Sequence, residues 1–254
     1  MSQQEFETLV IQGEYPVLRV MLNRPKLANA MNLKMVNELM AVMEKVENEN
    51  YRVLIISGGN GNFCAGGDIK DMQSAGADKQ ALVELNRAFG HMITKADHLP
   101  AAVICALEGA VLGGGFGLAC VSDLAIAVEK TQFGLPETSL GIIPAQIAPF
   151  VVKRIGLTQA RRMALFGNRI KAPEAMSLGL IHQVVGNSEQ LEEEITKAVK
   201  LAIKCAPAAS KVTKALIHCV EHEALNPLLD QAAVDFAEAV MGEGREGGAA
   251  FMQK

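Results

Sequence analysis

Hydrophobic and polar residues follow two recurring patterns along the chain, one typical of buried strands and one typical of amphipathic helices. The strand-like runs are short and rich in β-branched residues, and they begin at Val17, Val53, Ala102, Leu124 and Leu180. After the first run, Asn32 precedes apolar positions that recur at helical spacing from residue 33 to 46, which predicts a helix with Asn32 as its N-cap. The alternation of strands and helices predicts an α/β fold.

The last quarter of the chain has a different pattern, because its apolar residues recur only at helical spacing. Three such stripes cover residues 191–203, 212–220 and 227–240, and Pro207 and Pro227 mark the joints between them. We therefore divide the chain into a core of residues 1–199 and a helical region of residues 200–254.

Composition narrows the class of protein. The 254 residues suffice for one large domain, and a hydrophobic fraction of 50% with no Trp predicts a core of aliphatic residues and Met. A net charge of −4 gives no basic surface for nucleic acid or anionic membranes, so neither is an expected partner. The uncharged runs 109–122 and 138–152 are too short to span a membrane, and the N-terminus resembles no leader, so we expect a cytoplasmic protein.

Neither cysteine nor metal chemistry is favoured. The five cysteines lack a Cys-x-x-Cys spacing and lie mostly in apolar runs, as reduced thiols do. Cys64 has no His or Asp in a recognisable partner arrangement and is expected to be a small apolar core residue. The stretch from His218 to His222 matches H-x-x-E-H, a zinc peptidase pattern, but it lies in the helical region and lacks a third ligand, so we expect no metal.

Two glycine clusters and one glutamate are the candidates for catalysis. The clusters FCAGGDI (63–69) and VLGGGFGLAC (111–120) each follow a strand-like run and precede a helical one, a position where backbone N–H groups bind an anion or oxyanion. Neither matches a nucleotide-binding motif, and both also fit tight turns and close packing. Glu137 follows Pro136 in a loop, where partial burial would raise its pKa toward that of a working acid or base, whereas a solvated Glu is commoner there.

Three motifs, FCAGGDI, GAVLGGGFGLA and TQFGLPETSLGIIP, resemble in order and spacing those of the crotonase (enoyl-CoA hydratase/isomerase) superfamily. The similarity begins at MLNRPKLANAMN (21–32), continues through KAPEAMSLGLIHQVV (171–185) and reaches REGGAAFMQK (245–254). The resemblance implies a spiral of repeated ββα units, followed by helices that build a homotrimer or a dimer of trimers.

The same resemblance implies an acyl-CoA thioester substrate, whose coenzyme A is part of the substrate, and no other cofactor. The thioester carbonyl would accept hydrogen bonds from the backbone N–H groups of Gly67 and Gly114, which would stabilise an enolate. The adenine and pantetheine of coenzyme A would lie along a set of five residues: Lys26, Ala28, Ala65, Asp68 and Ile69. Without the resemblance, Lys26 reads as a surface charge and Asp68 as a helix cap.

One departure from the family pattern bears on the reaction. Well-studied hydratases of the family carry a second glutamate two residues after the GGG cluster, where this chain has Gly117, and Glu108 is a poor replacement. Together with PAQIAPFV, where Gln146 would hold water or line the pocket, this is similar to hydratases for methylglutaconyl-CoA and isohexenylglutaconyl-CoA. A hydratase using Glu137 as acid and base is therefore expected, with a Δ3,Δ2-enoyl-CoA isomerase or a non-catalytic acyl-CoA-binding scaffold as alternatives.

Overall fold

The predicted strands form most of a six-stranded sheet in the computed structural model, which describes residues 6–74, 76 and 78–245. The strand order is β1-β2-β3-β4-β6-β9, and all neighbours are parallel except the β1-β2 pair. The bounds are β1 (Leu9–Gln12), β2 (Val17–Leu22), β3 (Val53–Gly58), β4 (Ala102–Leu107), β6 (Leu124–Val128) and β9 (Gln183–Val185). Buried β-branched and leucine side chains on β2, β3 and β4 make this sheet the centre of the core.

A second sheet of three short strands has the order β5-β7-β8. Its strands are β5 (Ala110–Leu112), β7 (Gln132–Gly134) and β8 (Arg169–Lys171). In one unit, β4 lies in the large sheet, β5 lies in the small sheet, and the helix α4 (Gly114–Val121) follows. In the next unit, β6 lies in the large sheet and β7 in the small sheet, and η2 (Glu137–Leu140) and α5 (Ala148–Phe166) follow. The expected α/β fold with repeated ββα units is confirmed.

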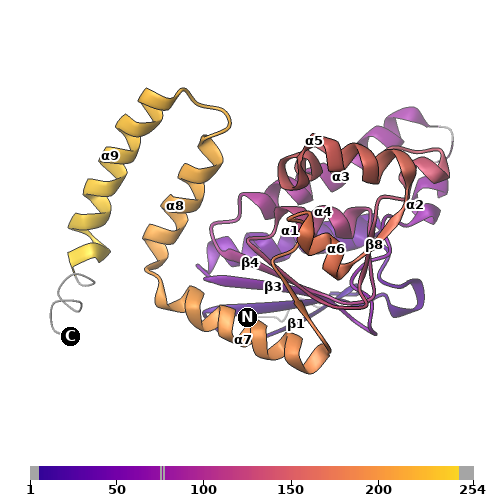
Figure 1. The fold of residues 1–254 in the computed structure, drawn as a ribbon, viewed down its shortest axis with the longest axis horizontal. Helices are drawn as coiled ribbons and strands as arrows, with labels where there is room; N and C mark the ends of the chain where they lie inside the picture. The colour runs from indigo at the N-terminus through magenta and orange to yellow at the C-terminus, as the bar shows by residue number, and fades with distance from the viewer. Residues whose placement is uncertain (1–5, 75, 77, 246–254) are drawn as a thin grey trace.

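Helices cover both faces of the large sheet (Figure 1). One face is packed by α1 (Leu33–Asn48), α3 (Lys79–Asp97), α4 and α5, and the main apolar core lies between them and the sheet. The predicted cap of α1 is confirmed, because the Asn32 side chain accepts a hydrogen bond of 3.0 Å from the N–H of Met35. The remaining short elements are η1 (Pro25–Leu27), α2 (Ile69–Ser74) and α6 (Ala172–Ser177).

One helix spans the predicted division between the core and the helical region. The predicted boundary between residues 199 and 200 falls inside α7 (Ser188–Lys204), whose Leu191 and Ile195 pack on the opposite face of the sheet in a second apolar cluster. Among the described elements, α8 (Pro207–Cys219) and α9 (Leu225–Met241) alone leave the body, as a hairpin on one side of the molecule (Figure 1). Residues 246–254 of the last family motif lie outside the described residues, and none of the described helices has the length and apolarity to cross a membrane.

Candidate active site

Glu137 lies at a turn that partly buries its carboxylate. The chain leaves β7, passes Pro136 and enters η2 at Glu137, and Gly141 ends this short helix with φ 73°. The Oε2 atom is buried and has no hydrogen-bond partner among the described residues. Burial removes water from the carboxylate and raises the pKa of Glu137. A carboxyl group with a raised pKa is suited to accept and return a proton near neutral pH.

The second glycine cluster brings the backbone close to this carboxylate. Gly113 connects β5 to α4 with φ 50° and ψ −117°, a conformation that disfavours residues with a side chain. A Cβ atom at Gly113 would lie 3.0 Å from Glu137 Oε1 and 3.2 Å from Gly66 Cα. The structure therefore brings the two glycine clusters and Glu137, which are far apart in sequence, to one point.

Two backbone N–H groups in the glycine clusters have no hydrogen-bond acceptor among the described residues. Met31 donates to the Gly66 carbonyl and accepts from the N–H of Asp68, both at 2.8 Å, so the pairing skips the N–H of Gly67. Gly114 is the first residue of α4, where the N–H has no partner within the helix. Neither N–H donates to another described residue. Unpaired backbone donors of this kind can stabilise an enolate oxyanion.

The place of the second family glutamate is occupied by apolar side chains. A Cβ atom at Gly117 would lie 2.5 Å from Ile147 Cγ2 and 3.3 Å from Ile93 Cδ1. Ile147 is itself buried, so glycine at position 117 makes room for it. Glu108 does not replace the missing group, because its carboxylate accepts a hydrogen bond from Ser188 at the start of α7.

The five residues expected along coenzyme A come from two loops that lie side by side. The N–H of Ala65 donates to the Ala28 carbonyl at 3.0 Å, and Lys26 and Ile69 are exposed nearby in sequence, in η1 and α2. The Asp68 side chain is already engaged: Oδ2 pairs with Arg24 at 2.9 Å and Oδ1 accepts from the N–H of Lys70 at 3.0 Å. Asp68 was expected either to line coenzyme A or to cap a helix, and these contacts support the helix cap.

Arg24 and Asn29 hold these loops together, and the sequence analysis missed both. Asn29 is fully buried; its amide donates to the Gly59 and Asn62 carbonyls, and its side-chain oxygen accepts from the Arg24 N–H at 2.8 Å. Asn29 has φ 58°, a left-handed conformation that Asn tolerates better than most residues. The Asn itself was therefore the signal that the sequence offered for a turn at this position. The segment RPKLANAMN was read only as part of the family resemblance.

Gln146 is bound to α3 through both the oxygen and the nitrogen of its side-chain amide. Its Oε1 accepts from Arg87 at 2.8 Å, and its Nε2 donates to Asn86 Oδ1 at 2.8 Å. Gly90 on the same helix leaves the space for this contact, because a Cβ atom there would lie 2.0 Å from Gln146 Oε1. One N–H of Nε2 and one lone pair of Oε1 remain for a water or for the pocket wall, and Arg87 is a polar residue that the sequence analysis missed.

The alternative nucleophile and the peptidase pattern find no support. Cys64 is buried within the first glycine cluster, and burial raises the pKa of its thiol to about 11, so it stays protonated. Helix α8 ends at Cys219, so His218 and His222 do not share a helix face; His222 is exposed, and Glu221 pairs with Lys153.

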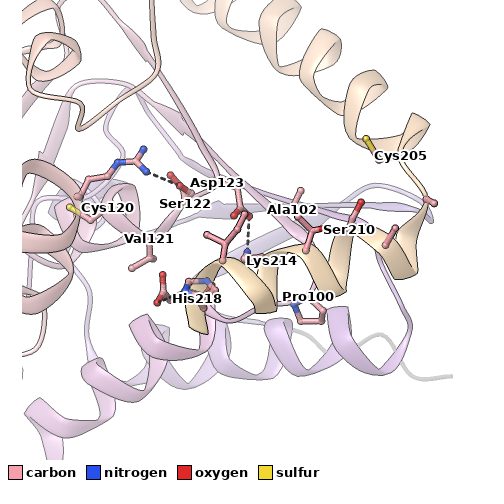
Figure 2. A pocket seen from close by; sticks show the side chains of 16 residues that line it. Pro100, Ala102, Cys120, Val121, Ser122, Asp123, Cys205, Ser210, Lys214 and His218 are labelled. Atoms are coloured by element: carbon pink, nitrogen blue, oxygen red, sulfur yellow. Dashed lines mark hydrogen bonds and ion pairs between the residues drawn. The ribbon is translucent and has the colours of Figure 1, made fainter. Parts of the chain in front are cut away.

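A separate cavity of about 700 Å³ lies between α8 and the core (Figure 2). Its lining includes Cys120, Val121 and Ser122 at the C-terminal end of α4, whereas Gly114 at the other end of the helix belongs to the candidate active site. Lys214 of α8 pairs with Asp123 at 2.7 Å across this cavity. None of the residues predicted from the sequence to act in catalysis or substrate binding lines it.

Comparisons with known proteins find similarity over nearly the whole chain. The family model described as enoyl-CoA hydratase/isomerase matches residues 12–254. The solved structure of Pseudomonas aeruginosa AtuE is 53% identical with a TM-score of 0.95, and that of an enoyl-CoA hydratase/isomerase from Marinobacter aquaeolei is 53% identical with a TM-score of 0.94; each comparison covers 97% of both chains. The 2,3-dehydroadipyl-CoA hydratase of Escherichia coli is 32% identical over 97% of this chain and 96% of its own length. The chain belongs to the enoyl-CoA hydratase/isomerase family, within the crotonase superfamily.

Proposed function

We propose that this enzyme adds water across the 2,3 double bond of an unsaturated acyl-CoA thioester, with Glu137 as its only acid and base. The observation that carries the proposal is the partly buried carboxylate of Glu137 beside Gly113, whose Oε2 has no partner among the described residues, together with two backbone N–H groups that donate to no other described residue. An inert scaffold has no need of a carboxylate kept in this state, because a buried and unpartnered carboxyl group costs free energy.

The proton transfers follow from these groups. The thioester carbonyl accepts hydrogen bonds from the N–H groups of Gly67 and Gly114, which polarise the double bond. The Glu137 carboxylate takes a proton from water as the water oxygen bonds to C3, and the electron pair of the double bond moves onto the thioester as an enolate. Protonated Glu137 then gives a proton to C2, which restores the carboxylate and releases the 3-hydroxyacyl-CoA.

The acyl group that we propose is branched or carries a terminal carboxylate. Helix α3 lies over the start of α4, because Phe89 approaches Gly114 and Ile93 approaches Gly117. Arg87 is exposed on the same helix and donates to Gln146 rather than to a carboxylate of the described residues, so its charge is available to an anionic acyl end. The Escherichia coli relative is named for 2,3-dehydroadipyl-CoA, a substrate of this type.

Δ3,Δ2-enoyl-CoA isomerisation is the second candidate, and the packing at Gly117 favours it. Isomerisation needs one base to move a proton from the α carbon to the γ carbon, and it needs no bound water. Ile147 and Ile93 make the wall at Gly117 apolar. Such a wall provides no group there to orient the water that hydration consumes.

Turnover in water enriched in heavy oxygen separates these reactions. The panel is crotonyl-CoA, 3-methylglutaconyl-CoA and a 3-enoyl-CoA, and mass spectrometry reads the product. Heavy oxygen gained by a 2-enoyl-CoA supports the hydratase, and conversion of the 3-enoyl-CoA to a 2-enoyl-CoA without mass gain supports the isomerase. Binding of all three CoA esters without turnover would contradict both and favour the scaffold.

The substrate class has its own test in Arg87→Met. We expect kcat/KM for 3-methylglutaconyl-CoA to fall about tenfold to a hundredfold, with little change for crotonyl-CoA, because one charge-assisted hydrogen bond is typically worth about 1.5 to 3 kcal/mol. Lys79→Met, at the exposed start of the same helix, is the matched control. Equal losses on both substrates would contradict carboxylate recognition by Arg87.

A further inference from the structure

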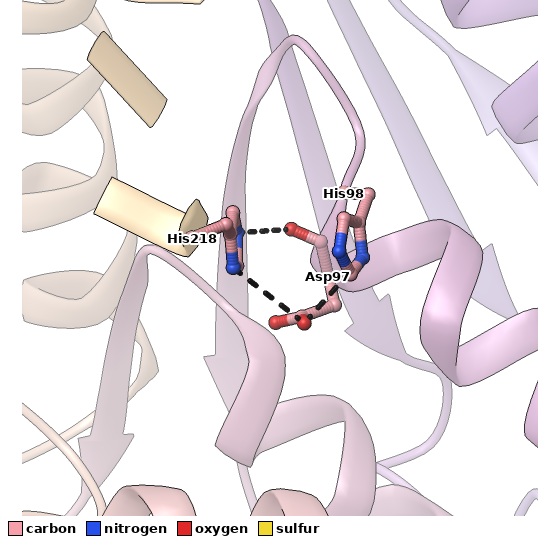
Figure 3. Close-up of side chains that lie close together, drawn as sticks. All are labelled: Asp97, His98 and His218. Atoms are coloured by element: carbon pink, nitrogen blue, oxygen red, sulfur yellow. Dashed lines mark hydrogen bonds and ion pairs between the residues drawn. The ribbon is translucent and has the colours of Figure 1, made fainter. Parts of the chain in front are cut away.

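Two histidines and an aspartate from separate parts of the chain meet where α8 contacts the core. Asp97 and His98 lie at the C-terminal end of α3, and His218 lies in the last turn of α8 (Figure 3). One ring nitrogen of each histidine and one oxygen of Asp97 all lie within 4.8 Å of one another. The two imidazole rings are stacked, with centroids 4.6 Å apart and an angle of 18° between their planes.

The Asp97 carboxylate lacks the usual partners of a nearly buried acid. Its side chain is 13% exposed, and within the described residues its ion pairs are with the two histidines alone, at 3.5 Å and 3.8 Å. The nearby ammonium groups are engaged elsewhere, since Lys214 pairs with Asp123 and Lys95 with Glu47. A carboxylate in this position needs a compensating positive charge.

Protonated histidines would supply that charge poorly, whereas a metal ion bound by neutral imidazoles would supply it. Two imidazolium rings stacked face to face repel each other, but two neutral rings do not. Each ring has one nitrogen at a backbone carbonyl: His98 Nδ1 lies 3.1 Å from the Thr94 oxygen and His218 Nε2 lies 3.0 Å from the Asp97 oxygen. In His218 the contact leaves the lone pair on Nδ1, the nitrogen that lies 3.8 Å from Asp97 Oδ2, as in many metal sites. His98 approaches Asp97 through Nδ1 itself, at 3.5 Å, so its half-exposed ring has to turn out of the stacked position to bind the same ion.

We propose that Asp97, His98 and His218 bind one divalent transition-metal ion of the Zn²⁺ class. Imidazole nitrogens with one carboxylate favour zinc and its neighbours over Ca²⁺ and Mg²⁺, which prefer oxygen ligands. The ion would connect the end of α8 to the end of α3, in addition to the Lys214 contacts with Asp123 and the Ala101 carbonyl. It would thus hold the helical hairpin on the core, away from Glu137.

The test uses the full, untagged chain stripped of metal with a chelator. Calorimetric titration with ZnCl₂ should give one ion per chain, and Zn²⁺ should raise Tm, because the ion binds only the folded arrangement. In His98→Gln and His218→Gln we expect affinity at least about tenfold weaker and no rise in Tm. His222→Gln, an exposed histidine in the same stretch, should behave as the parent protein.

His98→Gln keeps the test decisive if loss of His218 loosens α8, because His98 belongs to the core helix α3. Co²⁺ in place of Zn²⁺ reports the ligands by its absorption spectrum. No binding by the parent protein, equal binding by His98→Gln and the parent, or a sulfur-to-cobalt charge-transfer band from Cys205 or Cys219 would each overturn the proposal.

Discussion

At the scale of single residues, burial of the Glu137 carboxylate suits it for proton transfer but lowers the stability of the folded protein. Burial raises the pKa of Glu137, so the folded protein favours the protonated form relative to the unfolded chain. The stability that this group contributes is present below the pKa of an unfolded Glu and is lost as pH rises through the raised folded pKa. The structure therefore keeps an unfavourable charge where the reaction uses it.

Glu137→Gln tests this cost directly. Gln cannot ionise, so the variant should gain Tm relative to the parent protein at pH 8 and gain less, or nothing, at pH 4. Thermal unfolding across this pH range measures the difference. A Tm difference that does not change with pH would show that the carboxyl group titrates normally.

The Ile147 side chain fills the space that a side chain at position 117 would occupy. In Gly117→Ala we expect a loss of about 1 to 3 kcal/mol from overpacking against Ile147 Cγ2, which outweighs the gain of about 1 kcal/mol from replacing Gly in a helix. In an Ile147→Ala background the added methyl group should become stabilising. Ile147→Val keeps Cγ2 and is the matched control, so Gly117→Ala should remain destabilising there.

Denaturant unfolding of the single and double variants gives the coupling free energy. Additive effects of Gly117→Ala and Ile147→Ala would contradict the contact.

At the scale of elements, the loop before η1 and the start of α2 are joined by the Arg24–Asp68 ion pair, whose side chains are 18% and 9% exposed. Asp68→Asn removes the negative charge that faces a largely buried guanidinium, so we expect a loss on the order of 1 to 3 kcal/mol in unfolding free energy and a higher KM for the CoA ester. The exposed pair Arg19–Glu192 is the control, since Glu192→Gln should cost less than about 1 kcal/mol. Equal losses in the two variants would contradict the importance of the buried pair.

The elements that the sequence predicted well are those whose pattern is local. The strands from Val17, Val53, Ala102 and Leu124 begin at those residues, and Asn32 caps α1, because β-branched runs and caps act over a few residues. The run from Leu180 gave only the short β9, and α3 had no predicted counterpart, since polar residues and a central Gly90 weaken its helical pattern.

In the candidate site, too, the features with a local sequence pattern could be predicted and the long-range contacts could not. The glycine clusters and Glu137 were found from motifs, and the structure brings them together. The bonds of Gln146 to Asn86 and Arg87 join segments about sixty residues apart, and no local pattern predicts such a pairing.

At the scale of the whole molecule, the α8–α9 hairpin exposes several large apolar side chains. Leu229, Val234 and Phe236 are 56%, 52% and 71% exposed on α9, and Ile217 is 64% exposed on α8. This surface supports the proposal of a homotrimer or a dimer of trimers, in which the hairpin packs on another copy.

Light scattering after size exclusion tests this assembly. A trimer of 27.1 kDa chains has a mass of about 81 kDa. Phe236→Asp should shift the protein toward monomer without loss of helical circular dichroism, because a charge at the centre of an apolar contact is costly. Val83→Asp on α3, where the valine is 50% exposed, is the control and should keep the parent mass. A parent protein that runs as a monomer would contradict the proposal.

The most direct test of the account is the turnover rate of Glu137→Gln on a 2-enoyl-CoA that the parent enzyme hydrates, together with the Kd of the same ester. Gln keeps the shape of the side chain but cannot take or give the proton, so kcat should fall about 10² to 10⁴-fold while Kd changes little. A variant that retains kcat within tenfold of the parent, with an unchanged Kd, would show that another group moves the protons.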